Sequence, residues 1–114
     1  MTRQAVARLD RMLTFQKRGT GNDGYGNRRT EYEAQFDEPA ALAWRRGGEV
    51  QLAARMQARQ PVILTVRRNA RTMTIRPHWR AVWGDQKFDI REQPTIAADR
   101  RYLEMLAEAM PLNG

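Results

Sequence analysis

The chain has 114 residues, of which 41% are hydrophobic and 29% charged, and this length is typical of one domain spanning residues 1–114. It contains no cysteine and one histidine, so a disulfide framework, a thiolate nucleophile and a histidine-rich zinc site are excluded. Serine is absent as well, which rules out a Ser-His-Asp triad.

The net charge of +7 is unevenly distributed along the chain. Residues 1–44 carry seven basic and six acidic side chains, residues 45–80 nine arginines and one glutamate, and residues 81–114 four basic and six acidic side chains. A basic middle third indicates a polyanionic partner such as nucleic acid. The alternative is a solvated face in an arginine-rich protein, since arginine outnumbers lysine 18 to 2.

No apolar run approaches the roughly 20 residues that a membrane-spanning helix needs. The basic N-terminus, with Arg3, Arg8 and Arg11, has no apolar stretch behind it and does not resemble a signal peptide. We therefore expect a soluble protein that is made without export and has no membrane partner.

The first predicted strand covers residues 12–18, where Leu13 and Phe15 alternate with polar neighbours. Residues 19–24 then match the G-x-G-x-x-G nucleotide-binding pattern. No apolar helical stripe follows, so we interpret these glycines as a polar hairpin connection. Two further strands are predicted over residues 30–36, with Tyr32, Ala34 and Phe36 on one face, and residues 40–46.

Residues 49–59 favour a helix, because they are rich in helix formers between Gly47-Gly48 and Pro61. Arg55 and Arg59 stand four residues apart, a repulsive spacing on a helix unless an anion lies nearby. Short strands follow at residues 62–66, 72–76, 80–83 and 87–91, with a turn at residues 84–85. Residues 102–110 fit either a helix or a closing strand.

This pattern predicts a mainly β fold, a small antiparallel β-barrel with one inserted short helix or loop at about residues 48–59. Trp44, Trp79 and Trp83 are expected to be core or subunit-interface anchors. His78 is expected to have a core or surface role. Glu31 and Glu33 are expected to face solvent on one side of a strand.

Four segments resemble the tailed-phage head–tail joining family, also called head closure or stopper proteins. Residues 8–17 (RLDRMLTFQK) are similar to its opening strand, and residues 23–27 (DGYGN) with 30–32 (TEY) to its first hairpin. Residues 41–44 (ALAW) and 47–49 (GGE) resemble the strand that leads into its inserted segment. Residues 80–90 (RAVWGDQKFDI) resemble its last hairpin, so the resemblance covers about residues 8–108.

The resemblance implies a structural virion protein of a phage or a phage-derived particle such as a gene transfer agent. Members form a homo-oligomeric ring at the head–tail interface, between the portal and adaptor rings and the tail terminator or tail tube protein. The ring closes the DNA channel after packaging and docks the tail. The protein would be made in the cytoplasm of the host bacterium.

In such rings the segment that corresponds to residues 47–60 projects into the central channel. Arg45, Arg46, Arg55 and Arg59 lie in or beside this segment and are therefore the candidate site residues. There they would make non-specific phosphate contacts with double-stranded DNA. The alternative is that Arg55 and Arg59 pair with acidic residues of the neighbouring subunit.

The alternative function is a small basic β-barrel that binds nucleic acid, similar to an OB fold. Such a protein needs exposed aromatic side chains among arginines, as at Trp79-Arg80 and Trp44-Arg45. An enzyme is not expected. No catalytic residue, cofactor or metal ligand is predicted.

Overall fold

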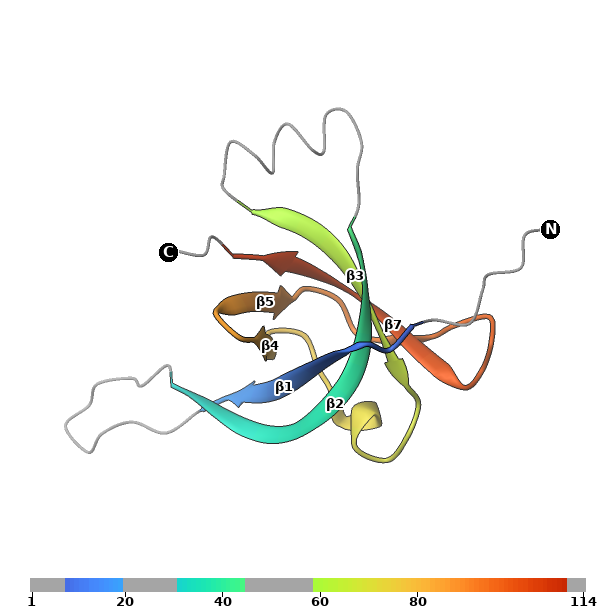
Figure 1. Ribbon diagram of the computed structural model, residues 1–114. Helices are drawn as coiled ribbons and strands as arrows, with labels where there is room; N and C mark the ends of the chain where they lie inside the picture. Colours follow the sequence, from blue (N-terminus) through green and yellow to red (C-terminus); the bar gives the residue numbers. More distant parts are fainter. Residues whose placement is uncertain (1–7, 20–30, 45–58, 111–114) are drawn as a thin grey trace.

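The computed structural model of the protein describes residues 8–19, 31–44 and 59–110 (Figure 1). Nearly all of the regular structure in these ranges is β-strand, and one short 3-10 turn is present. In chain order the elements are β1 (Arg11–Arg18), β2 (Tyr32–Trp44), β3 (Gln60–Arg67), η1 (Thr72–Thr74), β4 (Arg80–Trp83), β5 (Gln86–Ile90), β6 (Thr95–Ile96) and β7 (Tyr102–Ala109).

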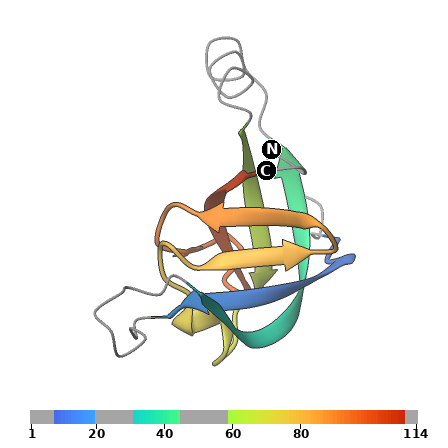
Figure 2. The same ribbon diagram turned by 90° about the vertical axis from the view of Figure 1, so that its left-hand side faces the viewer.

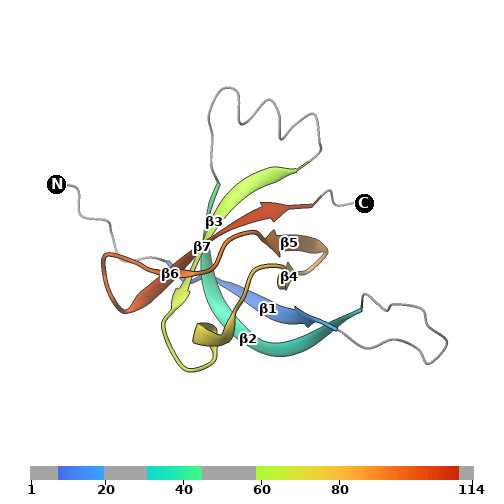
Figure 3. The same cartoon turned by 180° about the vertical axis from the view of Figure 1, so that it is seen from behind.

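Six of the strands form a closed antiparallel barrel. They follow one another in the order β3-β2-β1-β4-β5-β7, and β3 also pairs with β7, which closes the sheet. The short strand β6 pairs with β7 outside this ring of strands (Figures 1 and 3). The predicted fold class, a mainly β protein with a small antiparallel barrel, is therefore confirmed. The predicted insertion lies outside the described residues except for Arg59.

The barrel interior is filled by side chains that alternate along the strands, as the two-residue period of a strand requires. Large side chains such as Phe15, Leu64 and Phe88 are completely buried. Phe15 stacks on Phe36 at 5.5 Å between ring centroids, and Phe36 lies 6.2 Å from Trp79. The buried core consists of Leu13, Phe15, Ala40, Val62, Leu64, Val66, Ile75, Trp79, Ala81, Phe88, Ile90, Leu103, Met105, Ala107 and Ala109.

The two strands predicted over residues 30–36 and 40–46 are one long strand, β2. It pairs with β1 from Tyr32 to Ala40 and with β3 from Ala40 to Trp44. Pro39 lies just before the pairing with β3 begins, beside an edge of β2 that has no partner strand in the part of the chain that the structure describes. A proline is tolerated at such an edge because no ladder donor is missing there.

A β-bulge in β2 reverses the predicted orientation of its N-terminal half. Phe15 pairs with Phe36 but Gln16 pairs with Ala34, which leaves Gln35 as an extra residue. A bulge shifts the alternation of faces by one residue. The prediction that Tyr32, Ala34 and Phe36 share one face is therefore wrong, since Phe36 packs inside the barrel against Phe15 and Tyr32 lies on the other face.

The strand predicted at residues 72–76 is also wrong, because this segment begins with the 3-10 turn η1. The buried Thr72 hydroxyl donates to the Arg67 carbonyl at 2.6 Å and accepts from the Asn69 N–H at 2.9 Å. The Thr72 N–H in turn donates to the Asn69 side chain at 2.9 Å. Such local side-chain bonds compete with strand pairing. Residues 102–109, which fitted a helix or a strand, form β7 along the whole of β3.

Glu38 occupies an inward position of β2 and is only 2% exposed. Its carboxylate accepts a charge-assisted bond from Arg71 at 2.7 Å and a bond from the Asn69 amide at 3.2 Å. A buried carboxylate without such donors would be costly. These two contacts tie the loop before η1 to β2.

We expect Arg71→Met to lower the free energy of unfolding by about 1–3 kcal/mol, because Glu38 keeps its burial but loses its charged donor. Urea denaturation measures this change. Arg100→Met removes the same charge from an exposed residue of the β6–β7 turn and serves as the control. Equal stability of the two variants would show that the Arg71–Glu38 bond contributes nothing.

The turn between β4 and β5 requires a glycine. Gly84 has φ +60°, in the left-handed region, and the space around its Cα is open. The first central position of a two-residue hairpin loop favours glycine for this reason.

We expect Gly84→Ala to cost about 1 kcal/mol in unfolding free energy, with Asp85→Ala near neutral. Thermal unfolding of both variants would check this, and a neutral Gly84→Ala would contradict it.

Candidate functional site

The structure places one of the four predicted DNA-channel residues. Arg45, Arg46 and Arg55 lie outside the described residues, so their positions are not compared with the prediction. Arg59 is described and immediately precedes β3. Arg59 is therefore the described member of the predicted site.

The Arg59 side chain lies between two carboxylates of its own chain. Its Nη1 is 3.5 Å from Asp89 Oδ2 and 3.4 Å from Glu108 Oε1. The side chain remains 38% exposed, and one nitrogen makes both contacts. Arg59 is thus attached to the barrel wall while part of its side chain still faces solvent.

The two carboxylates come from adjacent strands in direct register. Asp89 of β5 is the cross-strand partner of Glu108 of β7. Like charges that face each other in a sheet repel unless cations separate them. Two further arginines approach this acidic pair, with Arg80 Nε 3.8 Å from Asp89 and Arg91 Nε 3.9 Å from Glu108.

The cluster continues onto β2 through an aromatic contact. The guanidinium of Arg80 lies 3.9 Å from the ring centroid of Tyr32, a cation–π geometry. The Nε of Arg80 is buried and has no hydrogen-bond partner in the part of the chain that the structure describes. We call this row of side chains on the outer face of the barrel the wall network; it consists of Tyr32, Arg59, Arg80, Asp89, Arg91 and Glu108. Figure 2 shows the neighbouring strands β4 and β5, which carry Arg80 and Asp89 in the middle of this network.

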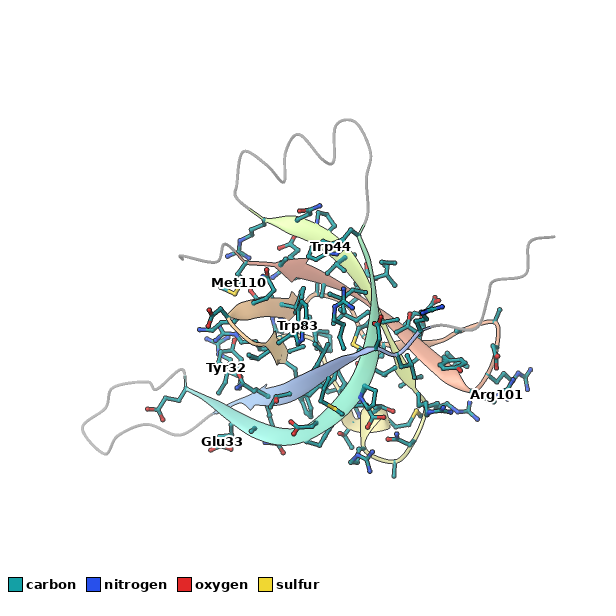
Figure 4. All side chains as sticks on the ribbon, in the orientation of Figure 1. Tyr32, Glu33, Trp44, Trp83, Arg101 and Met110 are labelled. Atoms are coloured by element: carbon teal, nitrogen blue, oxygen red, sulfur yellow. The ribbon has the colours of Figure 1, made fainter. Side chains whose placement is uncertain are left out.

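The three tryptophans have different environments. Trp79 is 8% exposed and belongs to the core, as predicted. Trp44 and Trp83, labelled in Figure 4, remain 40% and 43% exposed at the ends of β2 and β4. The Trp44 ring lies 6.1 Å from that of Phe88, and Arg11 lies 4.7 Å from the Trp83 ring centroid. Both are partly buried anchors with a free face.

The remaining arginines of the basic middle third lie near the other end of β3. Arg67 and Arg68 are exposed and have no acidic partner among residues 8–19, 31–44 and 59–110. Arg71 binds Glu38, and Arg76 donates to the carbonyls of its own loop. Among the described residues, the arginines of the basic middle third are therefore divided between two regions.

The β6–β7 turn adds an ion pair close to this second region. The backbone N–H of Arg101 and then its guanidinium donate to Asp99, which lowers the pKa of that carboxyl below its ordinary value. The same contact raises the pKa of Arg101. Arg68 is joined to this turn through a bond from its N–H to the Arg101 carbonyl at 2.8 Å.

Sequence reasoning missed the two carboxylates that organise the wall network. Asp89 and Glu108 stand at outward positions of two strands, but only the register of β5 against β7 brings them together. Glu31 and Glu33 are both exposed, as expected. In the described ranges, no group of three or more acidic or histidine side chains has the arrangement that a metal ion needs. No helix in those ranges is long and apolar enough to span a membrane.

Comparison with known proteins identifies one family, and the similar solved structures include two that cover most of this chain. The model of the phage head completion protein family matches residues 5–110. A chain from the virion of a native gene transfer agent particle is 22% identical, with a TM-score of 0.65 over 90% of this chain and 96% of that chain. A protein of Shigella flexneri 2a, solved in solution, is 18% identical, with a TM-score of 0.66 over 91% of this chain and 95% of that one. No curated protein matches.

The two solved structures share the barrel fold with this chain. The family match covers almost the whole sequence, including every strand of the barrel and the wall network. It agrees with the resemblance drawn from the four sequence segments. The chain therefore belongs to the phage head completion protein family, whose members are structural proteins of the virion.

Proposed function

We propose that the protein forms a homo-oligomeric ring at the head–tail interface of a phage or a gene transfer agent. The ring lies between the portal and adaptor rings and the tail, closes the DNA channel after packaging, and docks the tail terminator or tail tube protein. The observation that carries this proposal is the head completion family match over residues 5–110. The related fold within a gene transfer agent virion supports it. The protein acts by assembly and turns over no substrate.

In this ring, Arg45, Arg46, Arg55 and Arg59 face duplex DNA in the central channel. The ends of the segment that carries them support this placement. Trp44 pairs with Val62 across β2 and β3, so the segment is joined at both ends to two neighbouring strands of the barrel. An insertion between two paired strands is compatible with closure of the barrel. Repetition around a ring would produce a collar of guanidinium groups that contact phosphates without reading sequence.

Arg59 has a second role in this proposal because of its position at the root of the segment. Its bonds to Asp89 and Glu108 lie within one subunit, so the described geometry does not require an acidic neighbour from the next subunit. Because Arg59 is bound to the barrel, it fixes the position of one end of the segment that carries the other three arginines. The half-exposed Trp44 and Trp83 are suited to contacts with neighbouring ring proteins.

The alternative of an OB-like nucleic-acid binder loses one of its two supporting pairs. Trp79 is buried in the core, so it offers no face on which a base can stack. Of these two pairs, Trp44–Arg45 keeps an exposed tryptophan ring, and Trp83 beside Arg11 is exposed as well. The burial of Trp79 therefore weakens the case for base stacking relative to phosphate contacts.

We expect the combined variant Arg45→Gln, Arg46→Gln, Arg55→Gln and Arg59→Gln to assemble particles that lose packaged DNA. Removal of the guanidinium collar weakens the contacts that hold the duplex, and we expect at least a tenfold fall in nuclease-protected DNA per particle, equivalent to about 1.4 kcal/mol. Quantitative amplification of protected DNA measures this. Electron microscopy with portal and adaptor tests ring formation separately.

The matched control replaces four arginines that have no acidic partner in the described structure, Arg8, Arg67, Arg68 and Arg100, by glutamine. This control removes the same total charge, and particles that contain it should retain as much DNA as the wild type. If both variants lose DNA to the same degree, the effect comes from net charge and the channel assignment fails. If no ring forms on the portal and adaptor, the proposed function itself fails.

A further inference from the structure

A small pocket lies beside the wall network, on the side of the molecule where Figure 4 labels Tyr32. Its volume is about 160 Å³, and it is lined by Arg18, Tyr32, His78, Asp89, Ile90 and Arg91. These residues come from the C-terminal end of β1, the start of β2, the loop before β4 and the end of β5. The barrel closure brings them together.

The backbone at one wall of the pocket is held in an uncommon conformation. His78 has φ +77°, in the left-handed region that residues other than glycine seldom adopt. Its N–H donates to the Ile90 carbonyl at 2.8 Å, and the Ile90 N–H donates back to Trp79 at 2.9 Å. The burial of Trp79 holds this arrangement in place and leaves the His78 side chain exposed. Strained backbone of this kind gathers at functional sites.

The charges around the pocket leave a surplus of hydrogen-bond donors. Asp89 already faces two guanidinium groups, those of Arg59 and Arg80, with one contact to each carboxylate oxygen. Arg91 reaches Glu108 only through Nε at 3.9 Å. Each guanidinium carries five N–H donors, so most of the donors of Arg91 remain available.

Arg18 adds a second cation that is not neutralised. It is exposed and makes no ion pair or side-chain hydrogen bond within the described ranges. Two arginines that line one pocket repel each other unless an anion lies between them. Because Asp89 is engaged on both oxygens, it does not fill that role.

We propose that this pocket binds one phosphate group between Arg18 and Arg91. The planar guanidinium fork matches phosphate oxygens and can bind them in pairs. The volume of about 160 Å³ leaves room for a phosphate group. Arg59 contacts Asp89 but is not among the residues that line the pocket, and phosphate binding by Arg18 and Arg91 does not depend on ring formation.

The test is a titration of the full chain with inorganic phosphate in a phosphate-free buffer, followed by amide chemical shifts. We expect saturable shifts at His78, Ile90 and Arg91, with a dissociation constant on the order of millimolar. Arg18→Gln and Arg91→Gln should each weaken binding about tenfold, as loss of one charge-assisted contact implies. Arg18→Lys should restore part of the affinity, because it keeps the charge but not the fork.

The control is Arg100→Gln, which removes the same charge from the exposed β6–β7 turn and should leave binding unchanged. Thermal unfolding confirms that each variant is folded, and no side-chain partner of Arg18 lies among residues 8–19, 31–44 and 59–110. Absence of saturable shifts, or equal weakening in all three glutamine variants, would overturn the proposal. Equal affinity for acetate would also overturn it, since the site would then select any anion.

A second arm identifies the source of the phosphate. A short DNA duplex that binds more tightly than inorganic phosphate, and loses at least tenfold affinity in Arg18→Gln, assigns the pocket to the DNA backbone. Duplex binding that is unchanged in Arg18→Gln and Arg91→Gln, with phosphate binding still lost, assigns it to a free phosphate group. Both outcomes keep the phosphate site, and neither requires the ring.

Discussion

The ladder between β3 and β7 is the constraint on which the rest of the structure depends. Residues 60–67 pair with residues 102–109 in one continuous antiparallel register. This pairing converts a row of six strands into a closed barrel and removes two sheet edges that would otherwise be exposed. It also places Glu108 next to Pro61, two residues beyond Arg59. The wall network and the return point of the inserted segment therefore share the same ladder.

Closure of the barrel places two carboxylates side by side, and three arginines offset their repulsion. The register of β5 against β7 sets Asp89 opposite Glu108, which alone would weaken the sheet. Three guanidinium groups lie around this pair, at separations of 3.4–3.9 Å. Contacts of this length between partly exposed groups contribute at most about 1 kcal/mol each. The network therefore fixes positions on the barrel wall more than it stabilises the fold.

Much of the barrel could be predicted from the sequence, because alternation and β-branched residues determine most of its strands. The alternation of Leu13 and Phe15, and the run at residues 62–66, correspond to β1 and β3. The bulge at Gln35 could not be predicted, because one extra residue hardly changes the sequence pattern of β2. It changes only which face of the sheet the residues on its N-terminal side occupy. The turn at Thr72 is set by its bonds to Arg67 and Asn69, which strand propensity ignores.

The candidate site was less predictable than the fold for a related reason. The chain order of charges revealed the basic middle third, and Arg59 was chosen from it. Its partners Asp89 and Glu108 lie 30 and 49 residues further along the chain. No local pattern joins residues at that separation; only the strand order does. The surplus of arginine was therefore visible in the sequence, while its neutralisation by specific carboxylates was not.

The ion pairs of Arg59 give it a different role from the other three proposed channel arginines. If Arg59 left the wall to bind a DNA phosphate, Asp89 and Glu108 would face each other with one guanidinium fewer, and their repulsion would oppose the exchange. Arg45, Arg46 and Arg55 have no such restraint in the proposal. The root arginine would thus hold the segment to the barrel, with part of its guanidinium turned to the channel, while the three others supply most of the phosphate contacts.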